Sequence, residues 1–312
     1  MSHPVLPVVP RGPQPDISGV LSALGCFSFW GLFPIYFKLV GTVPPLEVLA
    51  HRVLGSALIL LAVLAIWKQG PALRAEFTQP RRLGFYLLTA LLISANWLIY
   101  IWAVQEGRIL EASLGYFINP LVNVLLGVLF LHERLNRRQG SAVLLAAAGV
   151  LVLVIGYGVF PWISLALALS FGSYGLLRKK AGHPPTLGLA VETLLIAPLA
   201  LLLLAAQGGG ALLTADTGVV VLLLAAGPIT VAPLLLFLQA TQRLRLSTVG
   251  LIQYLTPTLQ FLLAVVVYRE PFTTIHLLTF GCIWLGLILY SADAVAGHRD
   301  RQRELHGPDS VA

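Results

Sequence analysis

The sequence predicts an all-α integral membrane protein with ten transmembrane helices, arranged as two inverted repeats of five helices each. Three observations support this fold class: little charge, apolar stretches that match the thickness of a bilayer, and similarity between the two halves of the chain. Of the 312 residues, 57% are hydrophobic and only 11% are charged, and the mean hydropathy is +0.86. Soluble domains usually carry about 25% charged residues. Lipid is therefore the expected solvent of this chain.

The first half of the chain contains five apolar stretches of roughly 20 residues, the length of helix that crosses a bilayer. Proline, glycine and asparagine lie between them, as is usual for turns. The five predicted spans cover residues 17–39, 46–67, 83–104, 110–131 and 140–156. Before them, the proline-rich residues 1–16 lack the basic start and apolar run of a signal peptide, so we expect a disordered cytosolic tail.

The second half has the same organisation. Its separating segments are rich in glycine, proline or charge. The five predicted spans cover residues 159–177, 187–206, 218–240, 249–268 and 275–295. We therefore divide the chain into a first five-helix repeat at 17–156, a second five-helix repeat at 157–296 and a cytosolic C-terminal tail at 297–312.

Lysine and arginine predict how these helices are oriented, because cytosolic loops are enriched in both residues. With a cytosolic N-terminus, 16 of the 20 Lys and Arg residues fall in inside loops or tails. The outside ends contain only Lys38, Arg108 and Arg269, and Arg52 lies within a span. We therefore expect a multi-pass protein of a bacterial inner membrane with both termini in the cytosol. The net charge of +7 is scattered over these loops and forms no continuous face for nucleic acid.

A shift of 137 residues aligns five identical residues of the two halves. The pairs are Ala103 and Ala240, Gln105 and Gln242, Arg108 and Arg245, Pro120 and Pro257, and Glu133 and Glu270. Because each half has an odd number of spans, the second half enters the membrane from the opposite side, with Glu133 in the cytosol and Glu270 outside. Inverted repeats allow a central site to open to either side in turn. A transporter is the predicted class, with a scaffold, receptor or lipid scramblase as the alternative.

The second span carries a cluster of ionisable residues. Such groups cost roughly 2.5 to 3.5 kcal/mol within a span on insertion scales, so they should face a cavity or a partner. Glu47 and His51 share a helix face, and Arg52 lies beside them. The cluster fits an anion-binding or proton-responsive site. Alternatively, Arg52 extends to the outer interface and Glu47 neutralises it.

The seventh span carries one buried carboxylate, Glu192. It follows Pro184 by eight residues, just as Arg52 follows Pro44, so the two charges occupy matching positions in the two repeats. Glu192 could therefore approach Arg52 near the midplane, through a water or a ligand. It could instead pair with the inner basic cluster that begins at Arg178.

Uncharged polar residues on three other spans are candidates for lining a cavity. They share helix faces, and prolines weaken the backbone beside them at Pro120 and Pro257, which we predict to be hinges. These pattern features favour transport of a small amphipathic or aromatic solute over an ion pore. The same side chains could instead join helices to one another. The candidates are Asn96, Tyr100, Tyr116, Asn119, Asn123, Gln253 and Tyr254.

Four stretches carry a family resemblance: WGLFPIYFK from Trp30, EVLAHR from Glu47, EASLGYFINP from Glu111 and QYLTPT from Gln253. They resemble the RarD group, chloramphenicol-sensitivity proteins of the EamA branch of the drug/metabolite transporter superfamily, over about residues 19–293. The resemblance implies a ten-helix, inverted-repeat permease of the bacterial inner membrane. Trp30 is a further candidate residue for substrate contact. Gly55 stands where we expect tryptophan after the His-Arg pair, and Gln105 where we expect asparagine.

The sequence has no signature of an enzyme or of an ATP-driven pump. A nucleophile elbow, a His-Glu-x-x-His helix and a GxxxxGK[ST] loop are all absent. Cys26 and Cys282 lie in apolar stretches without metal-site spacing. We expect no catalytic residue, cofactor or metal; the expected partners are a small-molecule substrate and membrane lipids, and a homodimer stays open. The predicted function is that of a secondary permease for a small organic solute, metabolite or drug, working by alternating access between the repeats.

Overall fold

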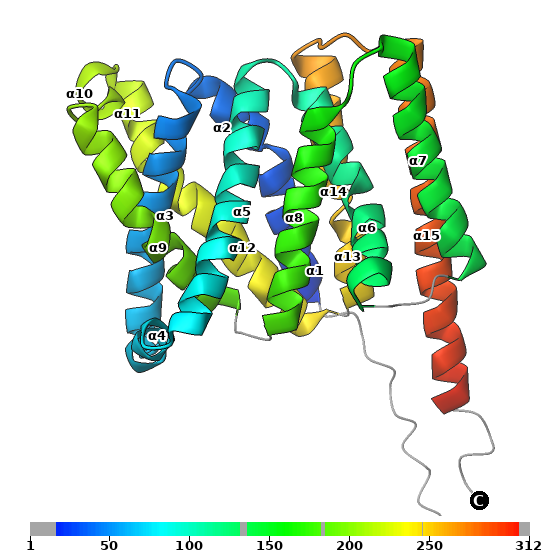
Figure 1. Cartoon of the computed structure of the whole chain (residues 1–312), viewed down its shortest axis with the longest axis horizontal. Coiled ribbons are helices and arrows are strands. Elements are labelled where there is room, and N and C mark those ends of the chain that lie inside the picture. The colour runs from blue at the N-terminus through cyan, green and yellow to red at the C-terminus, as the bar shows by residue number, and fades with distance from the viewer. Residues whose placement is uncertain (1–16, 132–135, 182–184, 245, 306–312) are drawn as a thin grey trace, which may run out of the picture.

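The computed structural model describes residues 17–131, 136–181, 185–244 and 246–305, and these residues form helices and turns without a strand (Figure 1). The predicted tail at 1–16 lies outside the described residues, as do Glu133, Arg245 and the last part of the predicted C-terminal tail. The final helix continues into that tail as far as Leu305.

The long helices lie side by side across the longest axis of the molecule, with α4 at the level of one set of helix ends and α10 at the level of the other (Figure 1). The first half of the chain contains α1 (Ile17–Gly31), α2 (Phe33–Leu39), α3 (Pro45–Ile66), α4 (Gly70–Phe77), α5 (Pro80–Gln105), α6 (Ile109–Leu131) and α7 (Arg137–Tyr157). The second half contains α8 (Trp162–Ala181), α9 (Pro185–Ala206), α10 (Ala211–Thr214), α11 (Thr217–Leu224), α12 (Ala226–Arg243), α13 (Leu246–Ile252), α14 (Leu255–Leu262), the π-helical turn η1 (Leu263–Val267) and α15 (Thr274–Leu305).

Nine helical segments of the described chain are long and apolar enough to cross a membrane. They coincide with nine of the ten predicted spans. α8 occupies the place of the predicted sixth span and has 20 residues, but three consecutive basic residues precede its last residue, Ala181, and it is not among the nine. Large apolar side chains lie on the outer surface; Leu58, Leu144 and Ile155 are each more than 70% exposed. Such a surface is typical of a protein surrounded by lipid.

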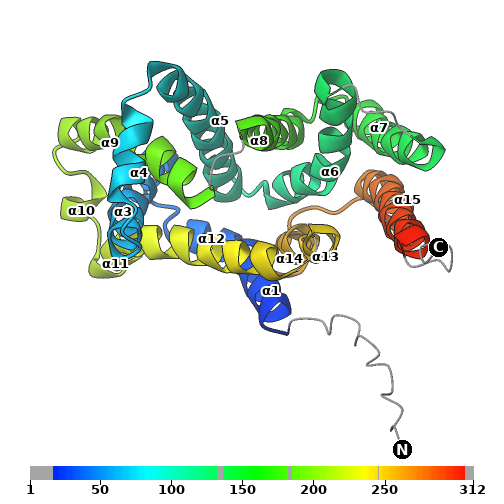
Figure 2. The ribbon, with the colours of Figure 1, turned by 90° about the horizontal axis from the view of Figure 1, so that it is seen from below.

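The packing of helices follows one pattern in the two halves. α1 packs against α12 and α14, and α8 packs against α5 and α6. α3 packs against α12, α9 packs against α5, and α3 and α9 also contact each other. α7 and α15 lie beside each other at one edge of the group of helices, next to α6 (Figure 2). The interior contacts therefore join helices from different halves.

The two predicted hinge prolines have different effects on their helices. α6 continues through Pro120 without interruption. The segment that aligns with it in the second half is interrupted at Gln253 and Tyr254, between α13 and α14. Gln253 lies four residues before Pro257. Both prolines lack the N–H that would bond the carbonyl four residues earlier, yet only the helix that contains Pro257 is interrupted. The two halves thus differ in backbone conformation at this helix.

α3 and α12 cross at a pair of glycines. A Cβ atom on Gly55 would lie 2.9 Å from both Cα and N of Gly227, so the two backbones are in direct contact. A larger side chain, such as the expected tryptophan, would not fit at position 55 unless the two helices moved apart. Arg52 precedes this contact by three residues and Thr230 follows it by three. The close crossing therefore brings these two side chains within reach of each other.

Candidate functional site

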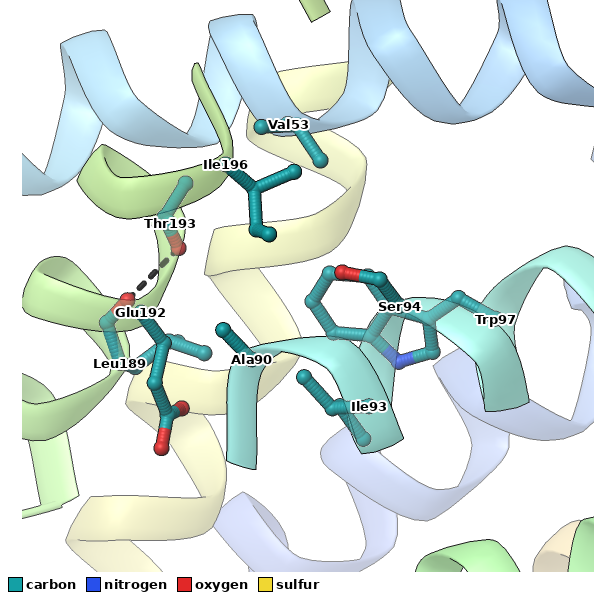
Figure 3. Close-up of a pocket in the computed structure, with 9 residues that line it drawn as sticks. All are labelled: Val53, Ala90, Ile93, Ser94, Trp97, Leu189, Glu192, Thr193 and Ile196. Atoms are coloured by element: carbon teal, nitrogen blue, oxygen red, sulfur yellow. Dashed lines mark hydrogen bonds between the residues drawn. The ribbon is translucent and has the colours of Figure 1, made fainter. Parts of the chain in front are cut away.

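A small pocket lies between α3, α5 and α9 (Figure 3). Its lining is largely apolar, with Trp97 on one side and Glu192 on the other, and Ser94 and Thr193 as further polar residues. The pocket volume open to a water-sized sphere is about 10 Å³, room for roughly one water molecule, whereas sites for drug-sized ligands usually enclose roughly 300 to 1,000 Å³. The helices are therefore closed around the pocket in this conformation.

Glu192 is only 1% exposed, and its carboxylate has three partners. Thr89 on α5 donates a hydrogen bond to Oε1 at 2.7 Å, and Tyr174 on α8 donates one to Oε2 at 3.0 Å. Arg178, also on α8, supplies the opposite charge at 3.5 Å. Of the two alternatives for Glu192, the structure therefore shows the pairing with the basic cluster, through Arg178.

A glycine on α9 allows this ion pair to form. The Arg178 guanidinium lies where a Cβ atom on Gly188 would be placed, one helical turn before Glu192. Any side chain at position 188 would therefore occupy the place of the Arg178 head group. Gly188 acts as a positioning residue for the Arg178 to Glu192 pair.

Arg52 is also buried, at 5% exposure, but in different surroundings. Its Nε donates to Thr230 Oγ1 on α12 at 2.8 Å. Its guanidinium carbon lies 4.3 Å from the ring centre of Trp97, and Phe33 and Phe37 on α2 provide two further rings at 5.4 and 5.6 Å. Arg52 therefore does not extend to the outer interface, which corrects that alternative.

The two buried charges share one kind of partner, a threonine hydroxyl, and differ in their other contacts. Arg52 is bonded to a threonine on α12 and stacked on rings of α2; Glu192 is bonded to a threonine on α5 and to a tyrosine of α8. Within the described residues no ion pair joins Arg52 to Glu192. Instead the pocket lies between them, because Glu192 lines it directly and Trp97 lines it while covering Arg52.

Glu47 and His51 form a separate cluster near α10. The Glu47 carboxylate accepts the backbone N–H of Ala211 at the start of α10, and its Oε1 lies 3.7 Å from His51 Nε2. Glu47 makes no ion pair with Arg52 in the described structure, so the expected neutralisation of Arg52 by Glu47 is not observed. The carboxylate instead holds the α9–α10 connection against α3.

Asn96 and Tyr100 lie on α5 near the Arg52 site, as predicted from their shared face. Asn96 Nδ2 donates to Leu167 O at 3.0 Å and to Ser170 Oγ at 2.9 Å, so one end of this amide joins α5 to α8. The Asn96 Oδ1 and Tyr100 hydroxyl atoms are buried without a hydrogen-bond partner among the described residues. These two atoms are free to bind a solute or water.

Tyr116 connects the predicted stripe on α6 to this region. Its ring lies 5.6 Å from the ring of Tyr100. Farther along the same stripe, Asn119 is buried with an unpartnered Oδ1, whereas Asn123 is exposed. The stripe therefore runs from the interior of the bundle to its surface, and Asn123 does not reach the pocket.

The remaining candidates lie away from the pocket lining. Gln253 and Tyr254 are half-buried at the helix break. Trp30 packs against Phe27 and Phe237, with 5.7 Å between ring centres in each case. In this conformation these residues support α1, α12 and the break between α13 and α14.

Polar contacts close the end of the bundle that carries Glu270. Both carboxylate oxygens of Glu270 accept backbone N–H groups at the start of α6, from Ile109 and Leu110, at 2.7 Å each. Burial raises the pKa of this carboxyl group above its usual value. Gln105, which stands in place of the expected asparagine, donates to the carbonyls of Val40 and Val43. Its longer side chain secures the turn between α2 and α3.

Sequence reasoning missed the hydroxyl partners of the two buried charges. Thr89 lies seven residues before Asn96 on α5 and therefore on the same helix face, a signal that was present in the sequence. Thr230 could be found only from the crossing of α3 and α12, because its own helix face carries no other polar side chain that singles it out. Phe33 and Phe37 were noticed only as part of a family-like stretch.

Apolar helices of membrane-spanning length around buried charges and unpartnered polar atoms define a multi-pass membrane protein with a polar interior. The model of the EamA-like transporter family matches this chain twice, at residues 17–155 and 160–292. The chain therefore belongs to the EamA-like transporter family.

Several bacterial proteins are similar over nearly the whole chain. The Escherichia coli protein RarD is 44% identical, covering 90% of this chain and 96% of its own. The uncharacterized transporter YojE of Bacillus subtilis is 45% identical, covering 90% and 96% respectively. A solved crystal structure of a protein superposes with a TM-score of 0.55 at 20% identity, covering 88% of this chain and 96% of that one; this likeness concerns the fold alone.

Proposed function

We propose that this protein is a secondary transporter that carries a small organic solute across a bacterial inner membrane. The observation that carries the proposal is the pair of buried ionisable groups, Arg52 from the first half and Glu192 from the second, with a pocket between them. Buried charges within spans are costly, and their retention usually marks a solute pathway. Family membership and transporter-named relatives support the same function.

The proposed architecture has ten spans in two inverted repeats, with α8 as the sixth span. The double match of the family model supports this division, since its boundaries agree closely with the predicted repeats. The shared pattern of helix packing and the threonine partners of both Arg52 and Glu192 support it as well. The distribution of Lys and Arg favours cytosolic termini, with the Glu270 end outside.

The proposed mechanism is alternating access at the pocket between the repeats. A pocket too small for most organic solutes fits an occluded or substrate-free conformation. The contrast between continuous α6 and the break before Pro257 supports exchange of conformations between the halves, with Pro120 and Pro257 as hinges. The Glu270 contacts with α6 would have to open when the site faces outside.

The test begins with metabolite profiles of bacterial cells with and without this gene, which nominate solutes. Each nominated solute is then assayed with purified protein in liposomes. We expect saturable flux that unlabelled solute competes away, and that protein-free liposomes lack. Lipid movement without specific solute flux would favour the scramblase alternative, and neither activity would favour a scaffold.

A further inference from the structure

Arg52 is a buried cation whose counter-ion is not provided by the described chain. Only its Nε has a hydrogen-bond partner there, the hydroxyl of Thr230, and Nη1 is buried with none. A guanidinium has five N–H donors and stays charged in proteins. Burying such a group without an opposite charge is strongly unfavourable. The site is therefore electrostatically incomplete as it stands.

Three carboxylates that the structure describes within the spans are engaged elsewhere. Glu47 accepts the N–H of Ala211 and faces His51. Glu192 is held by Arg178 and two hydroxyl groups. Glu111 lies 3.7 Å from Arg108. None of these acids forms an ion pair with Arg52, so no described residue balances its charge, and an anion from outside the chain would do so.

The aromatic rings around Arg52 orient it without neutralising it. Trp97, Phe33 and Phe37 attract the guanidinium through their π-systems, and cation–π contacts of this kind contribute roughly 0.5 to 2 kcal/mol each. They hold the planar group in place but carry no net charge. Planar guanidinium groups with free N–H donors bind carboxylates particularly well.

A second unpartnered donor and an apolar lining define the rest of the site. The Tyr100 hydroxyl is buried without a partner, and Tyr100 and Tyr116 both lie close enough to Arg52 to interact with it electrostatically. Trp97 contacts Arg52 and also lines the pocket, whose other walls are mostly apolar (Figure 3). A solute with an acidic group and a compact apolar or aromatic body matches these features.

We propose that Arg52 binds the carboxylate of the transported solute, with Tyr100 as a second donor and with the apolar body of the solute against Trp97, which lines the pocket. The proposal rests on the proposed transport function and narrows its substrate class to small organic anions with an apolar body. Arg52 is thereby assigned to substrate binding. Glu192, which pairs with Arg178, lines the opposite side of the pocket.

The test compares three probes that share a phenyl ring and differ in charge: phenylacetate, phenylacetamide and phenethylamine. Binding to the purified full-length protein in detergent is measured at pH 7 by the concentration dependence of the unfolding temperature. We expect phenylacetate to bind about tenfold more tightly than phenylacetamide, since hydrogen bonds to charged groups are the stronger kind. Phenethylamine should be the weakest of the three.

Variants assign this preference to Arg52. Arg52→Gln should bind phenylacetate and phenylacetamide equally, and Arg52→Lys should keep a reduced preference for phenylacetate. Arg108→Gln is the matched control, because Arg108 also lies over a tryptophan ring, Trp102, but is largely exposed; it should keep the full preference. If Arg52→Gln does not fold, the proposal is tested by the preference for phenylacetate over phenylacetamide in the wild type and by its reduction in Arg52→Lys.

Two results would overturn the proposal: no preference for phenylacetate over phenylacetamide in the wild type, or an equal preference in Arg52→Gln. The experiments also distinguish failure of the proposed anion site from failure of the proposed transport function. Liposome flux of neutral or cationic solutes without a carboxylate preference would refute the anion site and leave transport intact. Binding of phenylacetate through Arg52 without flux of any anion would leave the site intact and refute transport.

Discussion

Replacing Gly55 with alanine tests the helix crossing that positions Arg52. The added Cβ would lie 2.9 Å from the Gly227 backbone, and carbon atoms in contact prefer roughly 3.5 to 4.0 Å. α3 and α12 would therefore have to separate by at least about 0.6 Å, which backbone atoms cannot absorb by a rotamer change. The same displacement would stretch the 2.8 Å bond from Arg52 to Thr230. We expect a loss of about 1 to 3 kcal/mol in unfolding free energy, typical of overpacking.

The assay is equilibrium unfolding of purified protein in mixed micelles with increasing SDS. Gly281→Ala is the matched control, because a Cβ atom there would meet nothing within 4 Å. Alanine favours helix over glycine by up to about 1 kcal/mol, so this control should be neutral or slightly stabilised. The reasoning is refuted if Gly55→Ala unfolds at the same SDS fraction as the wild type, or if both variants shift alike.

The other predictions concern the carboxylates. Glu192→Ala should cost about 3 kcal/mol, since it breaks a buried ion pair with Arg178; Glu192→Gln should cost less because it can still bond Thr89, and equal unfolding temperatures for the two would contradict this. Gly188→Ala should displace Arg178 and lower the unfolding temperature, unlike Gly281→Ala. Burial raises the pKa of Glu270, so ionisation of this carboxyl group destabilises the folded state. The contribution of Glu270 to the unfolding free energy should be complete below the ordinary glutamate pKa of about 4.3 and fall as the pH rises towards the raised pKa. Glu270→Gln should abolish this decline in unfolding temperatures measured from pH 4 to 8, and an unchanged decline would refute its origin.

Hydropathy and length were sufficient to predict the helical membrane fold, because both are properties of contiguous sequence. Nine of the predicted spans recur as candidate membrane helices with boundaries that differ by a few residues. The short helices α4 and α10 were not predicted. α10 has four residues, and its start depends on a hydrogen bond to Glu47, a residue 164 positions away. Local sequence carries no sign of such a contact.

The candidate site was predicted in its charges but not in its partners. Arg52 and Glu192 were singled out by their positions eight residues after Pro44 and Pro184, and both side chains are buried. Which residues they contact depends on how far each helix is rotated and how closely it approaches its neighbours. That distance is set by Gly55 against Gly227 and by Gly188 against Arg178. Such pairings exist only in three dimensions, and a single sequence does not reveal them.

The central claim is that the two halves cross the membrane in opposite directions, and cysteine labelling of the full-length chain tests it most directly. Cys26 and Cys282 are the two natural cysteines, so replacing both with alanine gives a cysteine-free background. A single cysteine is then introduced as Arg137→Cys or as Pro271→Cys, and intact cells are treated with a membrane-impermeant maleimide. We predict labelling of residue 271 in intact cells and of residue 137 only after permeabilisation. Labelling of both positions from the same side would contradict the account.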